Sequence, residues 1–205
     1  MKLYPNQIPI FPLSGVIYFP KTNLPLNIFE QRYLDLVNDA INKNKLMGMI
    51  QSKKRGKDFY SVGCLGKISD YKKSSDGRML INLTGITRFE VLQEIENSKL
   101  YREFKVNYEK FSLDLKPVLE EVDIEPLMKK VKIFFKKTGL LLNWKEFEKL
   151  EIFQKIDTLS MIAPLTNEEK QKLLESTSLK EKVKTLESII NFYLHDFNHK
   201  NLTIQ

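Results

Sequence analysis

A chain of 205 residues can form one large or two small domains, with enough length to bury a hydrophobic core. Its composition, 42% hydrophobic and 29% charged, is typical of a globular protein. No apolar run approaches the roughly 18–20 residues of a membrane span, the N-terminus lacks the apolar stretch of a secretory signal, and the single cysteine excludes an intramolecular disulfide framework. These features predict a cytoplasmic protein that does not act in the membrane.

The formal net charge of +7 lies entirely in the first half of the chain. Residues 1–111 hold 18 Lys and Arg against 11 Asp and Glu, whereas residues 112–205 hold 15 of each kind. Such an excess favours an acidic partner, which could be nucleic acid, an anionic surface or an acidic polypeptide. A solvated lysine-rich surface is the alternative interpretation, because lysine also keeps proteins soluble.

The first predicted elements are short β-prone runs interrupted by Pro9, Pro12, Pro20 and Pro25. Proline cannot donate to a sheet ladder, so these strands are expected at sheet edges or to end at bends. A helix is predicted next, over residues 29–42, because apolar residues recur there at helical spacing.

Further β-prone runs follow this helix, and an Asp-Gly turn between two of them predicts a hairpin. The predicted strands cover residues 46–51, 60–71, 78–83, 87–95 and 101–108. A meander of about six strands with one embedded helix favours a partly closed barrel.

After about residue 115 the apolar period changes to that of helices, and four amphipathic helices are predicted. Gly139 is expected to end the first and Pro164 the second. The segments Thr166-Asn-Glu-Glu169 and Ser178-Leu-Lys-Glu181 have the form of capping boxes and are expected to open the third and fourth.

Four motifs occur in an informative order. They are the proline-rich segment that ends in Phe29-Glu-x-Arg-Tyr33, Val62-Gly-x-x-Gly-x-Ile68, Leu83-x-Gly-x-x-Arg-Phe89, and Lys170-Gln-x-Leu-Leu-Glu175. Together they resemble the LON substrate-binding domain, which is the N-terminal domain of Lon-type proteases. The resemblance covers essentially the whole chain. It implies an α+β fold, with a PUA-like, partly closed β-barrel over residues 1–114 and a helical bundle over residues 115–205.

Full-length members of that family continue into an ATPase module and a Ser–Lys protease. This sequence ends at Gln205 and contains no Gly-x4-Gly-Lys-Ser/Thr loop that would cradle a phosphate. The expectation is therefore a free-standing LON-domain protein that is not an enzyme and needs no cofactor.

The resemblance implies a module that binds unfolded or partner polypeptides and acts in proteolysis-related quality control. The expected mechanism is shallow apolar capture, with a strand added at an exposed barrel edge. Candidate contacts are Tyr18 and Phe19 in the proline-rich loop, and Met47 and Met49 on the next strand, because methionine adapts to varied partners.

Two alternatives stay open. Basic loops beside aromatic residues suit RNA or another single-stranded nucleic acid, which needs stacking and phosphate neutralisation. The residues of this alternative are Lys53, Lys54, Arg55, Lys57, Lys72 and Lys73. The other alternative is an adaptor that docks onto a separate ATPase or protease through its helical bundle.

Structural roles are favoured for the other prominent residues. Phe29 and Tyr33 are expected to pack inward one helical turn apart, with Glu30 complementing the helix dipole. Structural roles are likewise predicted for Arg88 and Phe89.

Cys64 has no neighbouring His or acidic residue that could activate it, so a buried thiol is predicted. His195 and His199 have the spacing of helical metal ligands, but beyond Asp196 no third ligand accompanies them, so no metal site is predicted.

Overall fold

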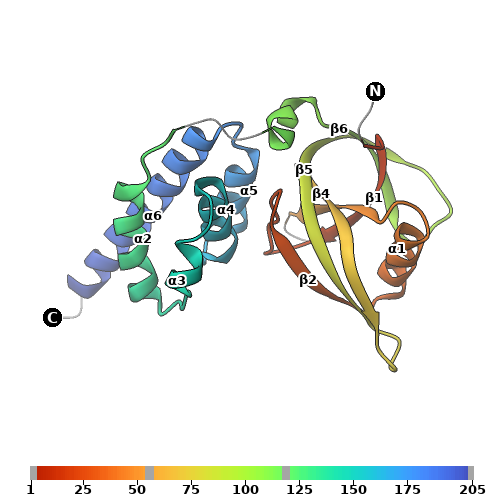
Figure 1. Cartoon of the computed structure of the whole chain (residues 1–205), viewed down its shortest axis with the longest axis horizontal. Coiled ribbons are helices and arrows are strands. Elements are labelled where there is room, and N and C mark those ends of the chain that lie inside the picture. Colours follow the sequence, from red (N-terminus) through yellow and green to blue (C-terminus); the bar gives the residue numbers. More distant parts are fainter. Residues whose placement is uncertain (1–3, 54–57, 117–120, 203–205) are drawn as a thin grey trace. The chain divides into compact units, whose positions relative to one another are not determined.

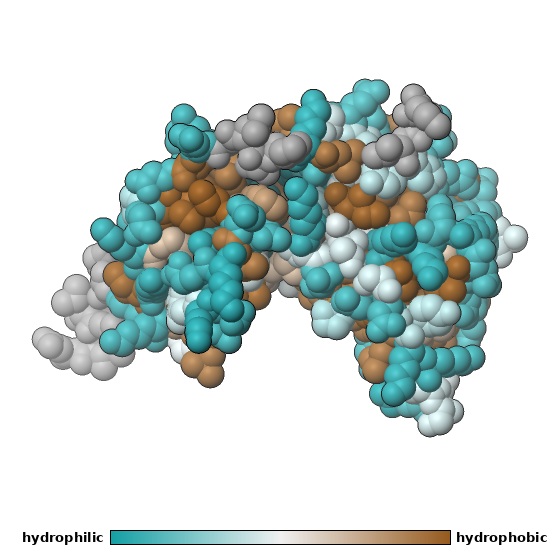
Figure 2. Space-filling view, viewed as in Figure 1, coloured by the Kyte–Doolittle hydropathy of each residue, from teal (hydrophilic) through white to brown (hydrophobic). Residues whose placement is uncertain are grey.

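The computed structural model describes residues 4–53, 58–116 and 121–202. The chain divides into two compact units, residues 1–117 (unit 1) and residues 118–205 (unit 2). Figure 1 shows that strands dominate unit 1 and that helices make up unit 2. On the face drawn in Figure 2 the surface is mostly hydrophilic and apolar residues gather in small patches.

Unit 1 is a mixed sheet of six strands, and its only parallel pair among the described residues is β1–β3. The strands are β1 (Gln7–Leu13), β2 (Asn23–Ile28), β3 (Leu46–Ser52), β4 (Phe59–Lys73), β5 (Met79–Ile95) and β6 (Arg102–Asn107). Their order is β2-β5-β4-β3-β1-β6, and β5 also pairs with β6. This extra pairing curls the sheet into a partly closed barrel rather than a regular one. The predicted fold class is confirmed.

The two strands predicted over residues 78–83 and 87–95 are one strand, β5, and this prediction was wrong. In the sequence Gly85 resembles a break, but it marks a close approach of two backbone segments. A Cβ atom at Gly85 would lie 2.1 Å from the carbonyl oxygen of Phe19. Lys21 N–H donates to the Gly85 carbonyl, and Gly85 N–H donates to the Thr22 carbonyl. The strand therefore continues through the glycine.

The helix α1 (Gln31–Ile41) buries Tyr33, Leu36, Val37 and Ala40 in the main hydrophobic core of unit 1. The helical spacing predicts that Phe29 packs inward beside Tyr33, but the Phe29 side chain is 64% exposed. The reason is that Glu30 is the N-cap and its backbone is extended, so Phe29 precedes the helix. The spacing of one helical turn does not apply to it.

Burial confirms the structural roles predicted for Cys64, Arg88 and Phe89 in unit 1. Cys64 is buried in the same core as α1. Phe89 is buried in a second core cluster. Arg88 is buried as well and pairs with Asp114 of the 3-10 helix η1 (Glu109–Leu115).

Unit 2 contains α2 (Glu125–Thr138), α3 (Trp144–Phe147), α4 (Ile152–Ile162), α5 (Asn167–Glu175) and α6 (Leu179–Leu202). Gly139 ends α2 in the left-handed conformation, with φ 72°, as predicted. The second predicted helix of this unit, which Pro164 was expected to end, is split into α3 and α4. Glu151 takes an extended conformation, and its N–H donates to Gln154 Oε1 at 3.1 Å. Glutamate is not one of the preferred N-cap residues, so the sequence pattern did not reveal this start.

The capping box predicted for α5 is present in full. Glu169 N–H donates to Thr166 Oγ1 at 3.2 Å, and Thr166 N–H donates to Glu169 Oε2 at 2.8 Å. Ser178 caps α6 by accepting from Glu181 N–H. In the described part of the chain, helices that are both long and apolar enough to cross a membrane are absent.

Candidate functional site

The four residues predicted to contact a peptide are all buried in unit 1. Met47 and Tyr18 belong to the core that α1 covers, and so does Met49. Phe19 is 0% exposed. The physical reason for the methionines is that β3 lies between β1 and β4 and is buried along its whole length. In the folded chain these buried side chains are not accessible to a ligand. The surface pockets of unit 1 are therefore the better candidates for a binding site.

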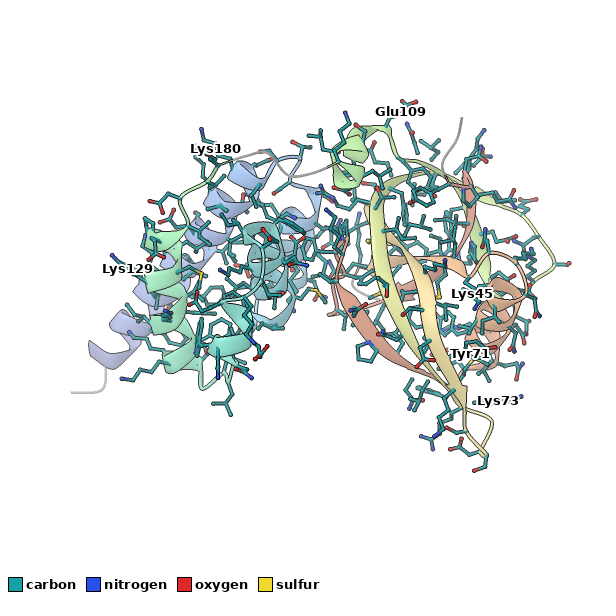
Figure 3. All side chains as sticks on the ribbon, in the orientation of Figure 1. Lys45, Tyr71, Lys73, Glu109, Lys129 and Lys180 are labelled. Carbon is teal, nitrogen blue, oxygen red and sulfur yellow. The ribbon has the colours of Figure 1, made fainter. Side chains whose placement is uncertain are left out.

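The residues of the nucleic-acid alternative do not gather in one place. Lys53 is exposed, and its Nζ lies 5.3 Å from the centre of the Tyr60 ring. Lys72 and Lys73 are exposed at the other end of β4, near Tyr71 (Figure 3). At about 3.3 Å per residue, the two ends of the 15-residue strand β4 are roughly 45 Å apart along the strand. Lys54, Arg55 and Lys57 lie outside the described residues, and nucleic-acid binding stays a prediction.

A pocket of about 300 Å³ lies between the end of β1, the end of β2 and the start of α1. We call it the β1–β2 groove, and it is lined by residues 11–14, 26–30, 32, 33 and 52. Its apolar lining includes Phe11, Leu13 and Leu26. The Phe11 and Tyr33 rings pack with centroids 4.4 Å apart, and burial raises the pKa of the Tyr33 hydroxyl.

Open strand edges border the β1–β2 groove on two sides. In the described part of the chain β2 pairs only with β5, and β6 pairs with β1 only as far as Ile10. Pro25 has no N–H, so it occupies a non-hydrogen-bonded pair opposite Asn82. Because orientation alternates along a strand, Asn27 also directs its N–H and C=O away from β5. These two groups are therefore open to another strand.

Phe29 stands between the β1–β2 groove and a second pocket of about 410 Å³. We call this second one the ribbon pocket, because the β4–β5 hairpin forms one of its walls. It is lined by residues 29, 31, 34, 38, 73 and 76–79. Sequence reasoning missed the exposure of Phe29. The signal was the alternation of β2: Leu24, Leu26 and Ile28 pack on the core, so the next residue points outward.

Arg32 supplies a positive charge at the start of α1. Its Nη2 lies 2.7 Å from Glu30 Oε2, and its guanidinium lies 4.4 Å from the centre of the Tyr33 ring. The Glu30 side chain makes no capping bond to the helix, and no acidic residue lies in the first turn. The Glu30 carboxylate at the N-cap therefore faces Arg32, and it makes no side-chain hydrogen bond to the first N–H groups of α1.

A third pocket, of about 250 Å³, lies at the other end of α1. Both acidic residues of its lining already have partners: Tyr101 donates to Asp39, and Lys99 Nζ donates to Glu103 Oε1 at 2.9 Å. Burial and the bond to Asp39 raise the pKa of Tyr101 to about 12. This internal pairing makes the pocket a weaker candidate than the β1–β2 groove.

Metal-binding side chains do not converge anywhere in the described part of the molecule. His195 lies on α6, whereas the side chain of His199 lies outside the described residues.

The amino-acid sequence is similar to those of known Lon proteases. The chain is 26% identical to the Lon protease of Syntrophus aciditrophicus over 206 residues, and 27% identical to that of Parabacteroides distasonis over 199 residues. These matches cover 93% and 91% of this chain. The chain spans about a quarter of the length of the relatives, since the matches cover 25% and 24% of them.

Two solved structures share the fold. The Lon N-terminal domain protein of Xanthomonas campestris superposes with a TM-score of 0.66 at 19% identity, covering 89% of this chain and 97% of that one. The N-terminal domain of the Mycobacterium avium complex Lon protease gives 0.66 at 16% identity, covering 90% and 98%. The family model of the ATP-dependent protease La (LON) substrate-binding domain matches residues 7–191. The chain belongs to the LON substrate-binding domain family.

Proposed function

We propose that unit 1 binds an extended apolar segment of an unfolded polypeptide in the β1–β2 groove. The observation that carries this proposal is the exposed Phe29 beside an unpaired strand edge, in a member of a substrate-binding family. A role in protein quality control is part of the same proposal, because exposed apolar segments distinguish unfolded chains from folded ones.

The bound segment adds as a strand along the end of β2. Its backbone pairs with the N–H and C=O of Asn27, and every second side chain points toward the apolar lining of the groove. One large apolar side chain covers Phe29. Burial of such a side chain stabilises a complex by roughly 1.5–3 kcal/mol. The affinity therefore depends on this contact more than on the other residues of the bound segment.

Unit 1 acts by binding alone in this proposal. Among the described residues, the groove lining includes neither His nor Cys.

The test is fluorescence anisotropy with a labelled apolar peptide, using the full chain. Phe29→Ala should weaken binding about tenfold, since it removes most of one apolar contact. Phe192→Ala is the matched control, because Phe192 of unit 2 is 68% exposed and Phe29 is 64% exposed. Equal affinity of both variants, or no binding of the unfolded peptide by the native chain, contradicts the proposal.

Asn27→Pro tests the strand addition separately. An outward-facing proline is tolerated on an edge strand, yet it removes one backbone donor from the open edge. We expect weaker peptide binding with unchanged thermal stability. Unchanged binding would mean that the peptide does not pair with β2.

A further inference from the structure

We propose that the segment bound by unit 1 is acidic beside its apolar anchor, with Asp or Glu placed two or three residues from the side chain that covers Phe29. This inference rests on the proposed function and names the class of polypeptide that the same site selects. A strand that leaves the β1–β2 groove past Phe29 reaches the ribbon pocket, because Phe29 lines both. Two or three extended residues span roughly 7–10 Å.

The side chains of the ribbon pocket favour a negative group. Its lining contains Lys73 and Arg78 but a single acid, Asp76. Asp76 is already committed to Arg78: Nε lies 2.9 Å from Oδ2, and the Arg78 N–H donates to Oδ1. Lys73 makes no ion pair with any described residue and lines the pocket side of the hairpin. An incoming carboxylate therefore meets a cation that the described part of the chain leaves unneutralised.

The start of α1 adds to this positive potential. Its first turn contains no acidic residue, and the Glu30 carboxylate turns to Arg32 instead of the helix N–H groups. The first 111 residues also carry the whole net charge of +7, which steers an acidic chain toward this unit. Such charges give selectivity and faster association more than raw affinity, which the contact with Phe29 supplies.

A polypeptide fits these observations better than a nucleic acid. The open edge at Asn27 offers one backbone donor and one acceptor, which is the pattern that an added strand satisfies. Single-stranded nucleic acid needs several aromatic platforms in a row. Of the aromatic side chains that line the two pockets, Phe11 and Tyr33 are buried, and Phe29 alone is exposed for stacking.

The experiment uses three labelled peptides with the same apolar centre and with Glu, Gln or Lys flanks, titrated with the full chain. We expect the Glu peptide to bind about fivefold more tightly than the Lys peptide at low salt, in the range of exposed ion pairs. The difference should fall toward zero at about 0.5 M salt, because exposed charges are screened.

Lys73→Gln locates the effect. It should reduce the preference for Glu over Gln flanks about twofold, within the range of one exposed pair. The matched control is Lys72→Gln: the change in charge is the same, but successive side chains of β4 point to opposite faces. This variant should keep the preference.

Other outcomes separate the two proposals. If all three peptides bind equally and Phe29→Ala weakens each of them, this inference fails and the proposed function stands. If none of them binds, the proposed function fails and this inference fails with it. If a single-stranded oligonucleotide displaces the Glu peptide at equal concentration, the choice of a polypeptide is overturned.

Discussion

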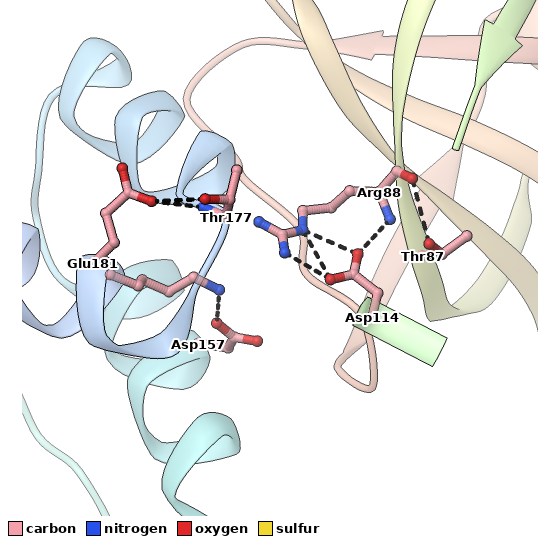
Figure 4. A network of polar contacts seen from close by, with 7 residues as sticks. Thr87, Arg88, Asp114, Asp157, Thr177 and Glu181 are labelled. Carbon is pink, nitrogen blue, oxygen red and sulfur yellow. Dashed lines mark hydrogen bonds and ion pairs between the residues drawn. The ribbon is translucent and has the colours of Figure 1, made fainter. Parts of the chain in front are cut away.

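Arg88 and Asp114 form the most deeply buried ion pair among the described residues of unit 1. Their side chains are 6% and 7% exposed, and Arg88 Nη2 lies 2.6 Å from Asp114 Oδ1 (Figure 4). Asp114 Oδ2 also accepts from the Arg88 backbone N–H at 2.8 Å. The guanidinium lies 4.4 Å from the centre of the Phe111 ring. These contacts hold η1 against β5, so the role of Arg88 is structural.

Asp114→Ala should lower the free energy of unfolding of unit 1 by about 3–5 kcal/mol, because it removes the carboxylate that pairs with the buried Arg88 guanidinium. Urea unfolding measures this change. The double variant with Arg88→Met should lose less than the sum of the two single losses. A loss below about 0.5 kcal/mol for Asp114→Ala, the size of an ordinary surface substitution, would show that this contact is not formed.

Lys170 is a buried cation of unit 2, and its Nζ donates to the Met161 carbonyl at 3.1 Å. Burial lowers the pKa of its ammonium below the ordinary value of 10.5. The unfolded chain therefore binds more protons than the folded chain, and this group makes unit 2 more stable as pH rises toward 10.5.

Lys170→Met removes the buried charge, so it should stabilise unit 2 relative to the native chain more at pH 7 than at about pH 9.5. Urea midpoints of both proteins at the two pH values measure this difference. A difference that is constant with pH would contradict a lowered pKa.

At the scale of elements, α5 shows how a short helix is held at its start. The reciprocal bonds between Thr166 and Glu169 satisfy two backbone N–H groups. Glu169 Oε2 also accepts from the Tyr193 hydroxyl at 2.9 Å, which joins α5 to α6. The start of α5 therefore contributes to the packing of unit 2 as well as to its own helix.

Thr166→Ala should cost about 1 kcal/mol of the free energy of unfolding of unit 2, which is the usual loss for an N-cap hydroxyl. Thr166→Ser keeps the hydroxyl and is the matched control. The free energies of unfolding of the two variants are compared by chemical unfolding. The unfolding is followed by the circular dichroism signal of the helices at about 222 nm. Equal losses in the two variants would show that the methyl group matters and the cap does not.

At the scale of the whole molecule, the two units have different charge and different architecture. The single tryptophan, Trp144, lies in α3 of unit 2. Its ring packs 5.7 Å from the centroids of Phe135 and Phe147. Tryptophan emission therefore reports on unit 2 alone.

We expect the two units to unfold as separate cooperative blocks. Asp114→Ala should shift the unfolding transition seen by hydrogen exchange in the β-strands of unit 1 and leave the midpoint of Trp144 emission unchanged. Thr166→Ala should do the reverse. If each variant shifts both signals equally, the chain unfolds as one cooperative block.

The sequence alone predicted those structural features whose signal lies within a few neighbouring residues. Gly139, Pro164 and the Thr166 capping box marked helix ends, because each acts on its own backbone within a few residues. A β-prone run likewise predicted β3 and a helical pattern predicted α2, and the buried thiol of Cys64 was predicted because no neighbouring His or acidic residue could activate it.

Tertiary structure decided which side chains remain at the surface. Methionines such as Met47 and Met49 are common at adaptable binding surfaces, but here they lie in the core that α1 covers. Phe29 is of a residue type that is common in cores, yet it is exposed because it precedes the N-cap residue Glu30 and lies outside α1. The sequence by itself therefore determined the family, the position of most strands and those helix ends that have a local signal. Only the pairing of β2 with β5, between residues about 55 positions apart, left an edge open beside Phe29, because such long-range contacts depend on the packing of the whole unit.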